Sequence, residues 1–82
     1  ELNQGYADIL LLKAPNIEYD IPNILIEFKF FKQSQKDINL DDAINKAQNQ
    51  IDNYKQTSKF KIHKSIVVVF KGFELIYCEF YK

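Results

Sequence analysis

Three charged residues in the first part of the chain have the types and spacing that phosphodiester chemistry requires. Asp8 lies within the apolar run GYADILLLK at residues 5–13. Glu27 and Lys29 lie within a second apolar run, ILIEFKFF, at residues 24–31. Short apolar runs predict buried strands, and a carboxylate is costly to bury without a partner. We therefore expect Asp8 to be paired inside the fold.

The three side chains meet on one face if the two strands pair antiparallel with Asp8 opposite Glu27 or Lys29, because residues two apart on a strand share a face. Two neighbouring carboxylates repel each other, and a divalent cation removes that repulsion. Mg²⁺ is held by one or two carboxylates with waters and phosphate oxygens. A nearby lysine orients water or stabilises charge on the phosphate. The three residues thus fit a metal-dependent phosphodiesterase, and they fit equally well a buried salt-bridge triad without chemistry.

A helix is expected to follow these two strands. From residue 40 to residue 56, in LDDAINKAQNQIDNYKQ, apolar residues recur every three or four positions, which predicts a helix with one apolar face. Asn39 is suited to cap the N-terminus of this helix. Asp41 and Asp42 place negative charge in its first turn, where the helix dipole favours it.

Two further strands complete the chain. The β-branched run SIVVVF at 65–70 predicts a buried strand, and FELIYCEFY at 73–81 predicts a last strand after a tight turn at Lys71-Gly72. The element order is therefore β-β-α-β-β, which belongs to the α/β (α+β) class. Strands that are apolar on both faces need a layer on each side, and one helix supplies one layer. We expect a missing N-terminal helix, a partner chain, or both.

Length and composition bound the class of protein. The chain of 82 residues makes one small domain, 1–82, and it begins at Glu1 without an initiator Met, so we expect a fragment of a longer protein. The hydrophobic content of 46% favours a packed core over disorder. No apolar run approaches the ~20 residues of a transmembrane helix and no secretory signal is present, which predicts no membrane contact and a cytoplasmic location. The single cysteine, Cys78, excludes an internal disulfide.

Charge is unevenly distributed, although the formal net charge is zero. The stretch from residue 53 to residue 64 contains no acid and four lysines: Lys55, Lys59, Lys61 and Lys64. Lysines contact nucleic-acid phosphates without reading the sequence, and such contacts weaken with salt. The segment is therefore a candidate backbone contact, with a solvated loop as the alternative.

The order and placement of the motifs resemble the PD-(D/E)XK nuclease superfamily. The similarity rests on G-Y-A-D at 5–8, I-E-F-K at 26–29 and Q-I-D-N-Y at 50–54, and it extends to about residue 81. The chain is similar to the bacterial group whose nuclease-like domain follows an AAA-type ATPase-like domain. The resemblance implies a restriction-endonuclease-like core with a mixed four-stranded sheet, from which the family's N-terminal helix and first strand are missing.

The resemblance also implies a function for individual residues on the two strands. Asp8 and Glu27 would ligate Mg²⁺ or Mn²⁺. The carbonyl of Phe28 would be a further metal ligand. Lys29 would be the catalytic lysine.

Two residues of the helix match the Q-x-x-x-Y element that some branches of this family carry. By resemblance, Gln50 would face the active site, and Tyr54 would shape the site or touch the nucleic-acid backbone. The alternatives are a helix-surface amide for Gln50 and a core residue for Tyr54.

Two functions remain open from the sequence. The first is metal-dependent phosphodiester hydrolysis of nucleic acid, expected to be DNA, by a nuclease domain that uses Asp8, Glu27 and Lys29. The second is a non-catalytic binding or interaction module attached to an ATPase, in which the same residues form a structural ion cluster. In either case an uncovered sheet face favours a homodimer.

Overall fold

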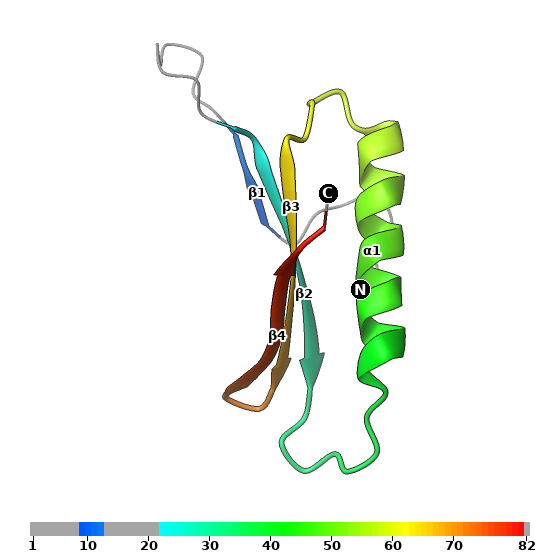
Figure 1. Ribbon diagram of the computed structural model, residues 1–82, viewed down its shortest axis with the longest axis vertical. Helices are drawn as coiled ribbons and strands as arrows, with labels where there is room; N and C mark the ends of the chain where they lie inside the picture. The colour runs from blue at the N-terminus through cyan, green and yellow to red at the C-terminus, as the bar shows by residue number, and fades with distance from the viewer. Residues whose placement is uncertain (1–8, 13–21, 82) are drawn as a thin grey trace.

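Four strands and one helix form two layers in the computed structural model, which describes residues 9–12 and 22–81 (Figure 1). The elements, in chain order, are β1 (Ile9–Leu11), β2 (Ile24–Phe31), α1 (Leu40–Thr57), β3 (Lys64–Lys71) and β4 (Glu74–Phe80). The four strands make one sheet, and α1 covers one face of it.

The sheet is mixed, with the strand order β1-β2-β3-β4. β1 is antiparallel to β2, β2 is parallel to β3, and β3 is antiparallel to β4. Parallel neighbours need a crossover connection, and α1 supplies it between β2 and β3. The predicted order β-β-α-β-β and the mixed four-stranded α+β sheet are confirmed, in the arrangement expected of a restriction-endonuclease-like core.

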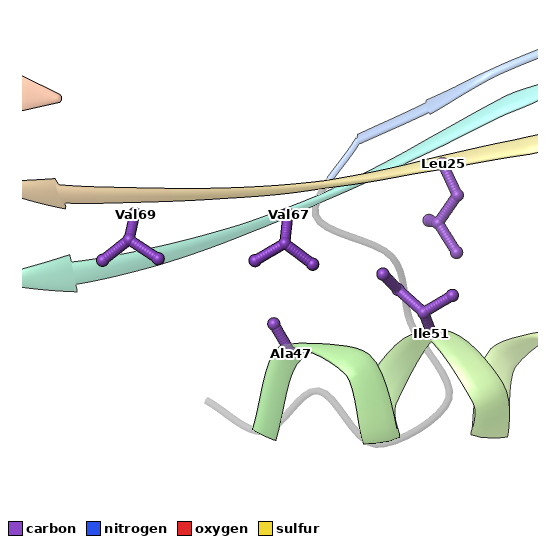
Figure 2. Packing of buried hydrophobic residues seen from close by; sticks show 5 residues of the cluster. All are labelled: Leu25, Ala47, Ile51, Val67 and Val69. Carbon is purple, nitrogen blue, oxygen red and sulfur yellow. The ribbon is translucent and has the colours of Figure 1, made fainter. Parts of the chain in front are cut away.

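The core lies between the sheet and α1 (Figure 2). Its central side chains come from β2, β3 and α1 and are almost fully buried: Leu25, Ala47, Ile51, Val67 and Val69. The strand members of this set are odd-numbered, and side chains alternate along a strand, so the odd-numbered residues of β2 and β3 face α1. Glu27 and Lys29 therefore lie on the helix-covered side of the sheet.

The helix α1 begins and ends within one residue of the prediction. The backbone N–H of Asp42 donates to Oδ1 of Asn39 at 2.9 Å, so Asn39 is the N-cap. At the other end, the N–H of Ser58 donates to the carbonyl of Tyr54 at 2.8 Å. In the described part of the chain, no helix is long and apolar enough to cross a membrane.

The strand β1 is more exposed than the sequence predicts, and it ends at Leu11, before the predicted end at residue 13. A buried strand is expected over residues 6–13, whereas the described strand covers Ile9–Leu11. Ile9 and Leu11 are 40% and 50% exposed. They are exposed because β1 lies at an edge of the described sheet. Their side chains also point away from α1, on the face that no described element covers. Leu10, between them, packs against the core.

The hairpin between β3 and β4 lies one residue later than predicted. β3 continues to Lys71, and the turn consists of Gly72 and Phe73. Gly72 has a φ of +60°, which residues with a Cβ rarely adopt, so the turn requires glycine there.

The face of the sheet opposite α1 is apolar, and no described element covers it. The rings of Phe28 and Phe30 each stack on Phe70, with centroids 6.3 Å and 5.7 Å apart. Phe30 is 71% exposed and Phe80 is 69% exposed. This face agrees with the expectation that one helix supplies only one layer, and the homodimer expected to cover it stays a prediction.

One bifurcated hydrogen bond ties the residue after β4 to α1. The hydroxyl of Tyr81 donates to the carboxylate of Asp52, 2.9 Å from Oδ2 and 3.1 Å from Oδ1. This hydrogen bond, followed by burial and by the negative charge of Asp52, raises the pKa of Tyr81 above 10.0. A group whose pKa is raised by folding stabilises the fold below its ordinary pKa, and it loses that contribution as the pH rises through the raised value.

We therefore expect the melting temperature of the wild type to exceed that of Tyr81→Phe from pH 7 to about pH 10 and to converge on it at higher pH. Melts followed by circular dichroism across this range measure the difference. Tyr77→Phe is the control, because it removes a tyrosine hydroxyl without removing the bond to Asp52. A difference between wild type and Tyr81→Phe that is independent of pH would contradict the prediction.

Candidate active site

Glu27 is the buried acid of the predicted site. It lies in the middle of β2, pairs in register with Val67 of β3, and is 2% exposed. Its burial follows from its odd-numbered position, which places the side chain under α1. A carboxylate is expensive to keep in an apolar layer. Its presence there indicates a specific interaction or chemistry rather than packing.

Lys29 follows on the same face of β2, where the cover of α1 becomes incomplete. It is half-buried and lines a pocket of about 380 Å³ between the end of β2 and the start of α1. No carboxylate among residues 9–12 and 22–81 forms an ion pair with Lys29. Glu27 and Lys29 thus share a face of one strand, with Lys29 at the pocket and Glu27 deeper under α1.

Asp8 lies outside the described residues, so its position beside Glu27 stays a prediction. The nearest described pairs are Ile9 with Ile26 and Leu10 with Leu25. In this antiparallel register, the residue of β2 that follows Ile26 is Glu27. Continuation of this register by one residue is what the hypothesis of a shared Asp8–Glu27 site requires.

Gln50 lies in the middle part of α1 and does not line the pocket. It is partly buried, one turn after Lys46, which lines that pocket. Asp52 lies on another side of the helix, where it bonds to Tyr81 beyond β4. The Oε1 atom of Gln50 is buried, and no residue in the described part of the chain donates to it. A buried carbonyl oxygen without a donor is costly, which marks Gln50 as more than an ordinary helix-surface amide.

Tyr54 packs against the core cluster, which agrees with the alternative of a core residue. Its predicted contact with nucleic acid is not tested by this packing. Phe28 directs its ring to the face opposite α1, against Phe70. The prediction for Phe28 concerns its backbone carbonyl and does not depend on the ring.

The four lysines of the basic segment lie at the end of the molecule where α1 ends and β3 begins (Figure 1). Lys59, Lys61 and Lys64 are exposed, and Lys55 is half-buried. Lys64 pairs in register with Ile24, and its Nζ lies 5.6 Å from the ring centroid of Phe80. The side chain of Lys64 therefore leaves the face opposite the one that carries Glu27. The expected contact of these four lysines with a nucleic-acid backbone stays a prediction.

Asn23 fixes this basic segment to the start of β2. Its backbone N–H donates to Nδ1 of His63 at 3.0 Å, and its side-chain amide donates to the carbonyl of Lys61 at 2.9 Å. Its own carbonyl accepts from the N–H groups of His63 and Lys64, at 3.0 Å and 3.2 Å. These hydrogen bonds to Asn23 hold the segment, and none of them uses a lysine ammonium group.

Two residues at or near the site escaped the sequence analysis. Lys46 lines the pocket, and its position four residues before Gln50 is the signal that places both on one flank of a helix. Ser65 is fully buried beside Leu25 on the helix-facing side, and its Oγ has no hydrogen-bond partner among the described residues. No spacing in the sequence distinguishes Ser65 from an ordinary strand residue.

Comparison with known proteins identifies the family. The family model described as the PD-(D/E)XK nuclease superfamily matches residues 1–80. No curated protein and no solved structure matches the chain. Nucleases of this superfamily act on nucleic acid and generally use divalent metal ions. The match covers nearly the whole chain, and the chain therefore belongs to the PD-(D/E)XK nuclease superfamily.

Proposed function

We propose that this domain hydrolyses phosphodiester bonds of nucleic acid, with DNA as the expected substrate, at a site built from Asp8, Glu27 and Lys29. The observation that supports it most is the pair on β2. Glu27 is buried, and Lys29 shares its face, lines an open pocket and has no described ion-pair partner.

The residues at hand fit a hard divalent cation. Mg²⁺ and Mn²⁺ favour carboxylate and carbonyl oxygens, which Asp8, Glu27 and the carbonyl of Phe28 would supply. Within the described ranges, no three His, Cys, Asp or Glu side chains lie close enough to hold a metal ion. The proposal therefore requires Asp8 in addition to Glu27. Such an ion, when bound, polarises the phosphodiester and favours deprotonation of water.

Lys29, Gln50 and Glu27 each have a separate role in this proposal. Lys29 donates from Nζ to the phosphate oxygens and stabilises the negative charge that develops there. The buried Oε1 of Gln50 accepts a hydrogen bond from water or from the substrate, and so orients it in the site. Glu27 is buried on the central strand β2, on the face that it shares with Lys29, which suits a metal ligand that must stay near the lysine.

Metal binding is the first test of this proposal. We expect saturating Mn²⁺ or Mg²⁺ to raise the melting temperature of the wild type by about 5 °C or more, because an ion that binds only the folded state stabilises it. Asp8→Asn and Glu27→Gln should show little of this shift. Differential scanning fluorimetry at equal ionic strength measures it.

Asp41→Asn is the matched control, since it removes one exposed acid from the first turn of α1, outside the pocket. It should retain the wild-type shift. Equal shifts in the wild type, Asp8→Asn and Glu27→Gln would rule out the proposed metal site and would leave the non-catalytic module attached to an ATPase as the better proposal.

A further inference from the structure

The pocket beside Lys29 is larger than a single phosphate needs. It is bounded by the end of β2, the loop that follows it and the first two turns of α1, and its volume is about 380 Å³. Pockets that bind small molecules start at roughly 300 Å³. The space next to Lys29 can therefore hold a further part of the substrate besides the reacting phosphate.

Lys46 stands on the helix side of this pocket, and Lys29 stands on the strand side. Lys46 pairs with Asp42, one turn earlier, with Nζ and Oδ2 3.2 Å apart. Its side chain is 69% exposed, so the ammonium group lies at the rim. An ammonium group has three donors, so Lys46 can keep the bond to Asp42 and still donate to an anion in the pocket.

We infer that this pocket binds the phosphate next to the scissile one, with Lys46 as the residue that binds it. This inference rests on the proposed function. In this arrangement the scissile phosphate lies at Lys29. The nucleic-acid strand then continues along the flank of α1 that carries Lys46 and Gln50. Both Lys46 and its partner Asp42 line the pocket, so the paired ammonium group lies at its wall. Asp37 and Asp42 also line the pocket and repel an anion, so a phosphate is favoured only where it contacts a lysine ammonium group.

The competing explanation is an ordinary surface ion pair. Exposed pairs at i and i+4 contribute only a few tenths of a kcal/mol to helix stability. Such a pair would make Lys46 dispensable for binding nucleic acid. The two explanations therefore differ in a measurable quantity, the affinity for an oligonucleotide.

The test measures binding of a labelled single-stranded DNA oligonucleotide to the intact protein by fluorescence anisotropy, in EDTA so that cleavage is prevented. Lys46→Ala should weaken binding about fivefold and reduce the slope of log K against log[salt] by about one. Lys36→Ala is the matched control, because it removes the same charge from an exposed residue of the neighbouring loop that does not line the pocket. Lys46→Arg should retain most of the affinity.

Single methylphosphonate substitutions along the oligonucleotide locate the contact. One methylphosphonate, next to the position cleaved when Mg²⁺ is added, should lower the affinity of the wild type for the oligonucleotide as much as the Lys46→Ala substitution does. The same methylphosphonate should not lower the affinity of the Lys46→Ala variant any further. If Lys46→Ala binds like Lys36→Ala, or if no single position shows this non-additivity, the inference is overturned.

The failure of this inference and the failure of the proposed function are distinguishable. A wild type that cleaves DNA while Lys46→Ala and Lys36→Ala bind equally well overturns the inference and leaves the proposed function intact. A wild type that never cleaves, while Lys46→Ala still loses affinity at one phosphate, overturns the proposed function and retains Lys46 as a phosphate-binding residue.

Discussion

Lys29→Ala is expected to lower the rate of metal-dependent DNA cleavage by about 10²- to 10⁴-fold, the range that positioned charge and proton-transfer groups contribute. The physical reason is that the Lys29 ammonium is half-buried at the pocket and free of a described ion pair. No described carboxylate neutralises its positive charge, which can therefore interact with the phosphate. Single-turnover cleavage of a labelled oligonucleotide measures the effect.

The fold should survive this change, because Lys29 contributes no described salt bridge to it. Lys29→Ala should unfold within about 1 kcal/mol of the wild type and keep the stabilisation by Mn²⁺. Lys32→Ala is the matched control, since Lys32 follows β2 directly, is exposed and does not line the pocket. Cleavage by Lys29→Ala at the rate of Lys32→Ala would exclude Lys29 from catalysis.

Ile51→Ala is expected to lower the free energy of unfolding by about 2–5 kcal/mol, the usual cost of emptying a buried aliphatic site. Ile51 is fully buried and contacts the strands from the centre of α1 (Figure 2). A domain of this size has a total stability on the order of 5 kcal/mol. The single substitution therefore removes a large share of it. Urea denaturation followed by circular dichroism provides the measurement.

Ile51→Val and Ile44→Ala calibrate this result. Ile51→Val removes one methylene and should cost about 1 kcal/mol. Ile44 is only partly buried against the core, so Ile44→Ala should cost clearly less than Ile51→Ala. If Ile44→Ala and Ile51→Ala destabilise equally, the side of α1 that faces the sheet differs from the one described.

Local sequence signals account for α1 and β2 almost to the residue. The helix was predicted over 40–56 and lies over Leu40–Thr57, because the apolar spacing and the Asn39 cap act within one or two turns. The strand ILIEFKFF coincides with β2, because its apolar run is bounded by polar residues on both sides. The bounds of both elements depend on interactions between residues close in the sequence, so the sequence predicts them.

The exposure of β1 and the direction of Lys64 could not be predicted in the same way. A strand reads as buried from its own composition, but whether it lies at an edge depends on which strands pair with it. Lys64 belongs to a basic segment in the sequence, and only its register with Ile24 shows that it leaves the other face. Both properties come from partners that are distant along the chain.

The sequence by itself determined the element order, the helix and its cap, the pair of Glu27 and Lys29 on one face of a strand, and the family. The tertiary structure alone decided that Glu27 is buried under α1 while Lys29 opens into a pocket, and that Lys46 stands across that pocket. Hydrophobic periodicity and secondary-structure propensity depend on residues close in the sequence. Burial and the walls of a pocket depend on how β2 and α1 pack against each other.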